Sequence, residues 1–365
     1  MVETTADPAA LPWLAAALQR ALREQRSHAL LVHGPSGVGQ FELALGLAQG
    51  WLCEAVPQTS QDDSTLRPCG RCAACRLVAA RTHPDLLVLV PEALRAALGW
   101  EPDAEADDSG DKASKAKPSK DIKVEAVRAA VVFSQTTSAR GRGKVVVLHP
   151  AERMNGISAN TLLKTLEEPP GDARFVLSSG APDALLPTIR SRCQAVTLTL
   201  PATEVAIEWL RRQGVADPAV LLAAAGGQPQ DALAWSHEGI DAALWSQLPV
   251  LVQRGAVAAV AGWPLPRLIE SLQKLCHDAL CVAAGAAPRY FPAGSLKGAS
   301  PHSDSAAAQP LHAWERELQR AARFAEHPWN AGLLAESLVE QGARAFEAAW
   351  PRSASAKVDS VHSRA

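Results

Sequence analysis

The chain has 365 residues, of which 47% are hydrophobic and 20% charged, and its formal net charge is -2. This length favours two or three globular domains, and the charge excludes the global positive field of a general nucleic-acid binder. We expect a cytoplasmic protein without a membrane span, because no run of about 18 apolar residues occurs and the first residues do not resemble a signal peptide.

Short apolar runs alternate with helical patterns through residues 1–200. Five runs predict strands, at 28–33, 86–90, 144–148, 174–177 and 195–200. Most lack polar alternation, as strands buried on both faces of a parallel sheet do, whereas the last contains two threonines and suits a sheet edge. Helices are expected at 40–52, 122–135, 159–167 and 184–190. Ser158 is placed to cap the third helix, and the alternation predicts a doubly wound α/β domain.

After residue 200 the strand signal disappears and helical patterns continue. We expect a small helical domain at 201–240 and a larger one at 241–351. The expected breaks are Gly226-Gly227, Pro264-Leu265-Pro266 and a long loop at 285–310. The composition of 101–120 and of the tail 352–365 is typical of solvated, disordered chain.

A glycine-rich turn, GPSGVG at 34–39, follows the first predicted strand and precedes a helix. Gly34 and Gly39 have the spacing of a phosphate-binding loop, in which they and Gly37 let backbone N–H groups converge on phosphate. Gln40 and Phe41 replace the lysine and the hydroxyl residue of that pattern, and neither can neutralise phosphate or hold Mg²⁺. The alternative interpretation is a plain strand-to-helix turn.

The strand at 144–148 ends without the carboxylates that an ATPase carries there. His149 and Pro150 occupy the positions of the residues that hold Mg²⁺ and activate water, and Glu152 lies too far along the chain for either role. Both losses affect one metal–phosphate unit, so we expect no hydrolysis at this site. Weak nucleotide binding by the loop backbone stays open.

Four of the seven cysteines are close in sequence: Cys53, Cys69, Cys72 and Cys75. Overlapping C-x-x-C pairs present sulfurs to one ion, and four thiolates complete the tetrahedron of a structural zinc site. A redox dithiol is the alternative. His83 is a substitute ligand, although an ordinary loop histidine is the simpler interpretation, and Cys276 and Cys281 are expected in a helical core.

Three further motifs resemble one family. Residues 160–170 read NTLLKTLEEPP, 188–193 read TIRSRC and 82–85 read THPD. With the altered loop and the cysteines, they resemble the clamp-loader subunits of bacterial DNA polymerase III over about residues 10–240. The resemblance implies an AAA+ (RecA-like) parallel-sheet domain with a zinc module at 53–75, a helical lid at 201–240 and an all-α oligomerising collar at 241–351.

The ATP site separates the branches of that family. Gamma/tau subunits keep the loop lysine and the acidic strand end, and they carry a nucleotide-sensing arginine where this chain has Gln230. Losses at three places resemble the delta-prime branch, which implies a subunit without ATP hydrolysis of its own.

The resemblance also assigns a role to Arg192 of the Ser-Arg-Cys segment. In this family that arginine projects into the ATP site of the next subunit, where a guanidinium stabilises charge on the γ-phosphate. The alternatives are pairing with an internal carboxylate or with DNA phosphate. Arg190 is a weaker candidate for the same role, and Lys164 is a candidate contact for DNA phosphate.

The implied partners are gamma/tau and delta subunits and, through their complex, the sliding clamp and primed DNA. Such a chain would be a component of the DNA polymerase III holoenzyme. Two other functions stay open on the sequence: an active gamma/tau-like clamp-loader ATPase, and a zinc-stabilised DNA-binding module.

Overall fold

The computed structural model describes residues 11–55, 67–100, 118–260, 262–301, 305–324 and 330–351. The chain divides into two compact units, residues 1–205 and 206–365. Most of the 101–120 segment and the whole 352–365 tail, both expected to be disordered, lie outside the described residues. The finer boundary expected at residue 240 stays a prediction.

A five-stranded parallel sheet forms the centre of the first unit, in the order β2-β3-β4-β1-β5. The strands are β1 (Ala29–His33), β2 (Leu86–Leu89), β3 (Val145–Leu148), β4 (Arg174–Ser179) and β5 (Gln194–Thr197). All five predicted strands are confirmed. The outer position of β5 is confirmed as well, and the exposed side chains of Thr197 in the strand and Thr199 just after it explain why this run alone looked polar.

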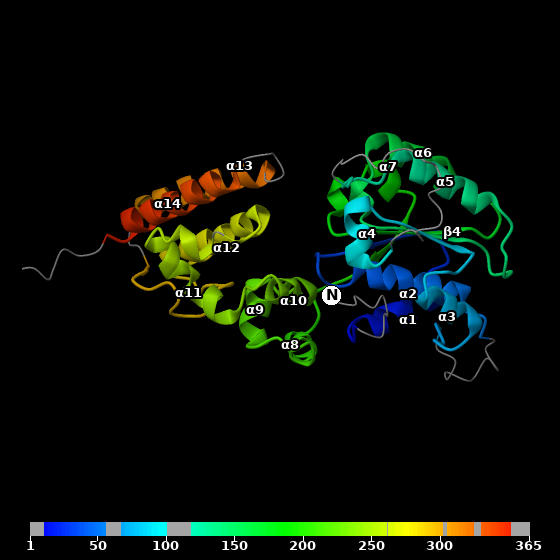
Figure 1. The fold of residues 1–365 in the computed structure, drawn as a ribbon, viewed down its shortest axis with the longest axis horizontal. Coiled ribbons are helices and arrows are strands. Elements are labelled where there is room, and N and C mark those ends of the chain that lie inside the picture. Colours follow the sequence, from blue (N-terminus) through cyan, green and yellow to red (C-terminus); the bar gives the residue numbers. More distant parts are fainter. Residues whose placement is uncertain are drawn as a thin grey trace, which may run out of the picture. The chain divides into compact units, whose positions relative to one another are not determined.

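Helices cover both faces of this sheet. They are α1 (Leu14–Glu24), α2 (Gln40–Leu52), α3 (Ala73–Ala79), α4 (Glu92–Leu98), α5 (Val124–Gln135), α6 (Gly156–Glu167) and α7 (Pro187–Arg190). Figure 1 shows α5 and α6 on one side of the sheet and α1 and α2 on the other. Alternate strand residues, such as Leu31, Phe175 and Leu177, join the core beneath α5 and α6. Two-sided covering is why the strands have continuous apolar sequences.

The start of α6 corrects one expectation. Asn155, not Ser158, caps this helix: its side chain accepts the backbone N–H of Ser158 at 2.8 Å. Ser158 lies inside the helix, is fully buried, and donates its hydroxyl to the carbonyl of Ile122 at 3.0 Å. The prediction was wrong because both residue types cap well, and only the long-range bond to Ile122 decides between them.

The elements described in the second unit are all helices. They are α8 (Thr203–Arg212), which begins just before the unit boundary, α9 (Pro218–Ala224), α10 (Pro229–His237), α11 (Ala242–Gln253), α12 (Leu265–Ala283), α13 (Gln309–Arg323) and α14 (Ala331–Ala349). The breaks expected at Gly226-Gly227 and near Pro264 are confirmed. The loop expected at 285–310 is confirmed in its described part, apart from a 3-10 turn at Ser305–Ala308.

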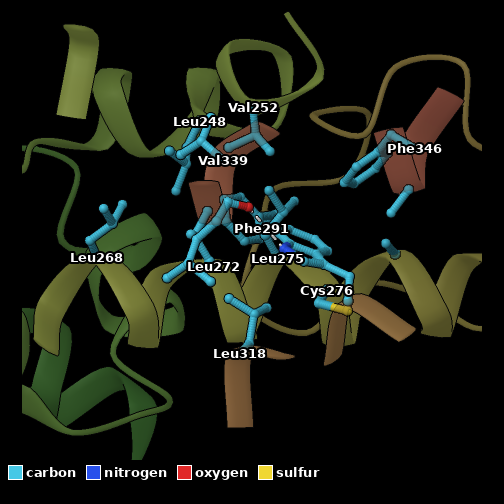
Figure 2. Packing of buried hydrophobic residues seen from close by; sticks show 14 of the residues in the cluster. Leu248, Val252, Leu268, Leu272, Leu275, Cys276, Phe291, Leu318, Val339 and Phe346 are labelled. Atoms are coloured by element: carbon cyan, nitrogen blue, oxygen red, sulfur yellow. Dashed lines mark hydrogen bonds between the residues drawn. The ribbon is translucent and has the colours of Figure 1, made fainter. Parts of the chain in front are cut away.

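One apolar core joins the helices of the second unit. Figure 2 shows Leu248 and Val252 of α11, Leu272 and Leu275 of α12, and Val339 of α14 meeting around the loop residue Phe291. The ring of Trp245 stacks on Phe291 with centroids 4.4 Å apart, and Trp235 of α10 lies 5.0 Å from Trp245. Residues on both sides of position 240 therefore share this core.

Asp85 holds the edge of the sheet together in the first unit. Its carboxylate is fully buried and accepts hydrogen bonds from Ser138 Oγ at 3.0 Å, Ala139 N at 2.8 Å and Arg140 N at 2.9 Å. Lys144 Nζ lies 3.0 Å from Asp85 Oδ1. The net effect of these contacts is a lowered pKa of Asp85. Burial alone would raise this pKa, but the hydrogen bonds from the Ala139 N–H, the Lys144 ammonium and the other donors outweigh it.

We expect Asp85→Asn to lower the free energy of unfolding by about 3–5 kcal/mol, because Lys144 then stays buried without a counter-charge. The pKa of Asp85 is lower in the folded than in the unfolded chain. The ionised carboxylate therefore makes its full contribution to the free energy of unfolding above the unfolded pKa of about 3.9, and this contribution is lost as pH falls through the folded pKa. Urea denaturation across that acidic range measures both effects. The exposed Lys123–Glu92 pair, broken by Glu92→Gln, is the matched control and should cost no more than about 1 kcal/mol. Equal losses in the two variants would contradict the assigned role of burial.

Candidate functional site

The loop between β1 and α2 is tightly enclosed. A Cβ added to Gly34 would lie 2.4 Å from the Leu198 carbonyl oxygen, and one added to Gly39 would lie 2.6 Å from Leu11 Cδ1. Gly37 and Gly39 have φ values of +66° and +96°, which a side chain would strain. The loop therefore has the backbone of a phosphate-binding turn, and residues before α1 and after β5 pack directly against it.

Gln40 fills the inside of this loop with its own side chain. The residue is only 5% exposed. Its Nε2 donates to the carbonyl of Gly34 at 3.0 Å and also to the carbonyl of Pro35. An amide held in this way satisfies two loop carbonyls from within the turn, and it brings no positive charge to the place where a phosphate would bind.

Phe41 and His149 close the neighbouring space at the end of β3. Their ring centroids are 4.7 Å apart, and His149 Nδ1 lies 2.9 Å from Ser178 Oγ of β4. Burial lowers the pKa of His149 to about 4, so the ring is neutral near pH 7. The end of β3 is therefore occupied by a neutral ring that packs against an aromatic side chain.

Glu152 is used structurally. Its Oε1 accepts the backbone N–H of Gly180 at 3.1 Å, beyond the end of β4. Pro150 contributes no backbone donor here. The three residues after His149 thus include one carboxylate, that of Glu152, and it is bound to the backbone just beyond the end of β4.

The four clustered cysteines converge on one point, as predicted. Their sulfur atoms all lie within 4.8 Å of one another. The Sγ–Sγ distance is 3.9 Å for Cys53 and Cys72 and also 3.9 Å for Cys69 and Cys75. A tetrahedral zinc ion with bonds of about 2.3 Å requires sulfurs about 3.8 Å apart. The arrangement therefore fits a tetrahedral metal ion.

The environments of the four thiols shift their pKa values in different directions. Although burial acts in the opposite direction, N–H donors from Arg71 and Cys72 lower the pKa of Cys69 to about 6. Backbone donors likewise lower the pKa of Cys72, whereas burial raises the pKa of Cys53 and Cys75. Four sulfurs at these distances repel one another when ionised, and a divalent cation at their centre would remove that repulsion.

His83 is not part of the cysteine cluster. It is buried, and its Nδ1 accepts the backbone N–H of Asp85 at 3.0 Å. The cluster is instead tied to the sheet through Glu54, whose Oε1 lies 2.6 Å from an Arg140 terminal nitrogen. Glu54 Oε2 also accepts the Ala74 N–H at 3.4 Å.

A second group of ligand-type side chains, His277, Asp278 and Cys281, lies on α12. Asp278 is fully buried and accepts the backbone N–H groups of residues 289, 290 and 291 at 2.8–2.9 Å, so it anchors the long loop. Cys276 is buried as expected, but Cys281 is only partly buried, because it lies beside the half-exposed His277. This part of the core prediction was wrong.

Arg192 lies just after α7 and is paired within the chain. Its Nε donates to Glu167 Oε1 at 2.7 Å, one terminal nitrogen donates to the same oxygen, and the other donates to the Thr188 carbonyl at 2.9 Å. The internal-carboxylate alternative is thus present in the structure. Arg190 pairs with Asp183 at 2.6 Å.

Two other candidate residues lie apart from these contacts. Lys164 is exposed on α6, and Gln230 is the second residue of α10. The sequence analysis missed Glu167 and Asp85 as partners, and their only signal was their place in the LEEPP and THPD motifs. None of the described helices has the combined length and apolar character needed to cross a membrane.

Comparison with known proteins gives one consistent result. A family model described as DNA polymerase III, delta subunit, matches residues 12–202. The chain is 40% identical over 222 residues to DNA polymerase III subunit delta' of Pseudomonas aeruginosa, covering 60% of this chain and 58% of that protein. Identity to the Escherichia coli K12 subunit delta' is 31% over 290 residues, covering 76% and 78%.

Two further matches are more distant. DNA polymerase III subunit tau of Escherichia coli K12 is 34% identical over 166 residues, which cover 46% of this chain and 20% of that protein. A solved gamma subunit-related protein from Thermotoga maritima aligns with a TM-score of 0.39 at 18% identity, covering 91% of this chain and 99% of that one.

We expect the His149 ring to titrate near pH 4 in the folded protein instead of near 6.5, and NMR of the imidazole signals measures this midpoint. Since the folded pKa lies below the unfolded one, the neutral ring stabilises the fold fully above about pH 6.5, and this stability is lost as pH falls towards 4. Over this pH range the neutral ring contributes at most about 3 kcal/mol to the free energy of unfolding.

The variant His149→Gln is the control for other titrating groups. Between pH 6.5 and about 4, the free energy of unfolding of the variant should depend less on pH than that of the wild type, because the variant lacks the ring. The carboxylates titrate in both proteins and contribute equally to the pH dependence of each. A wild-type midpoint near the unfolded value would show that the ring is solvated, contrary to its packing on Phe41.

Proposed function

The chain belongs to the family of DNA polymerase III delta-prime subunits, and we propose that it acts as the non-hydrolysing delta-prime subunit of a clamp loader. One observation carries the second part of this proposal. Gln40 occupies the inside of the glycine loop, where an ATPase places a lysine towards the phosphates.

The electrostatics of the degenerate site support the lack of hydrolysis. Phosphoryl transfer needs Mg²⁺ and cations that neutralise charge on the phosphate oxygens. Gln40 is neutral, Phe41 has no oxygen for the metal, and His149 is uncharged near pH 7 because burial holds its pKa at about 4. The remaining carboxylate, Glu152, is bonded to Gly180.

We further propose that Arg192 acts in trans at the ATP site of a neighbouring gamma/tau subunit. It is 29% exposed at the side chain and follows the short helix after β4, on a turn between α7 and β5. An arginine suits this role because its charge is permanent and its donors form a rigid fork. The partners in this proposal are gamma/tau and delta subunits, the sliding clamp and primed DNA, in the cytoplasm.

The metal proposed for the cysteine cluster is a structural zinc ion. All four protein ligands are sulfur, a set that zinc prefers, and they leave no coordination position for water. The cluster joins Cys53, directly after α2, to Cys72 and Cys75 at the start of α3, so the ion would connect these two helix ends.

We expect the purified chain to contain about one zinc ion, and Cys72→Ser to lose it. Loss of a structural metal should lower the free energy of unfolding by more than about 4 kcal/mol. Elemental analysis and thermal denaturation before and after chelation measure these effects. Cys281→Ser is the matched control and should keep its zinc. Disulfides among the four cysteines in freshly purified protein, without metal, would favour the redox interpretation.

The trans role predicts that Arg192→Ala lowers ATP turnover by a complex reconstituted from gamma/tau, delta, this chain, clamp and primed DNA. An arginine finger contributes a factor of about 10³–10⁵ to the rate at its own site. Its removal should therefore silence one ATP site, and the complex should lose that site's share of the total turnover. Arg192→Lys should not restore turnover, since an ammonium lacks the planar fork. Size-exclusion chromatography should show unchanged assembly.

Arg190→Ala is the control for general charge loss near α7 and should leave turnover unchanged. Full turnover with Arg192→Ala would remove the trans role.

The similarity to subunit tau makes an active ATPase the second candidate, and robust Mg²⁺-dependent hydrolysis by the purified chain alone would favour it. A pull-down with gamma/tau tests the third alternative. Both clamp-loader candidates should be retained by gamma/tau, whereas an independent DNA-binding module should not.

A further inference from the structure

Two acceptors fix the orientation of the Arg192 guanidinium. Glu167 Oε1 takes the Nε–H and one N–H of the adjacent terminal nitrogen, and the Thr188 carbonyl takes one N–H of the other terminal nitrogen. A guanidinium has five N–H donors in one plane. Within the described residues, these contacts leave one donor on each terminal nitrogen.

The base of this arrangement is rigid. Glu167 is the last residue of α6, directly after Thr165 and Leu166, which are buried at 8% and 1% exposure. Thr188 belongs to α7, whose Ile189 is fully buried in the same core. The two acceptors therefore belong to elements that pack in one apolar core, while the arginine between them reaches the surface.

We propose that Glu167 is the positioning residue for Arg192, holding its guanidinium with the remaining pair of donors turned towards an incoming phosphate. This inference rests on the proposed trans role of Arg192. A free arginine side chain has many rotamers, and ordering it on contact with a partner costs free energy. Glu167 and Thr188 order it within the chain before the partner arrives.

Helix electrostatics alone do not favour a carboxylate at the position of Glu167. The C-terminal end of a helix has a partial negative charge, which disfavours a carboxylate in the last turn. Arg192 compensates both Glu167 and the helix end, so the pair has a reason to persist in the folded chain.

The geometry favours positioning over inhibition. A carboxylate that masked the arginine would have to occupy the end of the guanidinium where both terminal nitrogens point. Glu167 instead binds the edge formed by Nε and one terminal nitrogen. The pair is also partly solvated, with side-chain exposures of 29% and 49%, so it cannot hold the arginine strongly against a triphosphate.

The test compares Glu167→Ala, Glu167→Gln and Arg192→Ala in the reconstituted complex. Glu167→Ala should lower the kcat of the Arg192-dependent ATP turnover by about three- to tenfold, with an unchanged KM for ATP. Glu167→Gln should restore most of it, because the amide oxygen still accepts the two N–H groups. Asp183→Ala breaks the neighbouring Arg190 pair and is the matched control, with turnover expected to match the wild type.

The outcomes separate this inference from the proposed function. If Arg192→Ala lowers turnover but Glu167→Ala does not, the positioning role is wrong and the trans role stands. Higher turnover in both Glu167 variants would identify an inhibitory latch and would also overturn positioning. If Arg192→Ala itself has no effect, the trans role fails first. Thermal denaturation of each variant distinguishes any loss of turnover from a loss of folding.

Discussion

The amide of Gln40 determines what the glycine loop of this chain does. In a working phosphate-binding loop, backbone N–H groups point into the turn and bind the phosphate oxygens of the ligand. Here Nε2 of Gln40 bonds to the carbonyls of Gly34 and Pro35, so the turn is stabilised by a residue of the chain itself. The helix that follows, α2, begins at Gln40 itself and packs on the sheet.

Further contacts within the protein follow along the same edge of the sheet. Phe41 at the start of α2 stacks on His149 after β3, and His149 bonds to Ser178 at the end of β4. Glu152 then bonds to Gly180 beyond β4. Contacts between α2, β3 and β4 thus fill the carboxyl edge, where an open α/β sheet normally binds its ligand.

The sequence predicted those parts of the molecule whose signal is local. Strands covered on both faces are uninterrupted apolar runs, and the C-x-x-C spacing of Cys69, Cys72 and Cys75 specifies a ligand cluster directly. The helices α1, α3 and α4 were missed. Helices α3 and α4 have only seven residues each, whereas α1 has eleven residues with one buried apolar face (Leu14, Leu18 and Ala21), a pattern that the sequence does show. Short helices show too few turns for periodicity to decide.

The carboxylates that organise the structure could not be predicted for a different reason. Asp85 accepts N–H groups 54 and 55 residues away, Asp278 caps a loop 11 to 13 residues away, and Glu167 meets Arg192 across 25 residues. No local pattern encodes such pairs, since each partner lies in a different part of the sequence.

Burial decides which of these carboxylates are structural. Asp85 and Asp278 are fully enclosed, and their removal would leave buried donors unpaired at high cost. Glu167 and Arg192 are partly solvated, and their pair contributes little to stability. The Glu167–Arg192 contact thus adds little to the fold, and its effect within the chain is to fix the direction of a permanent charge.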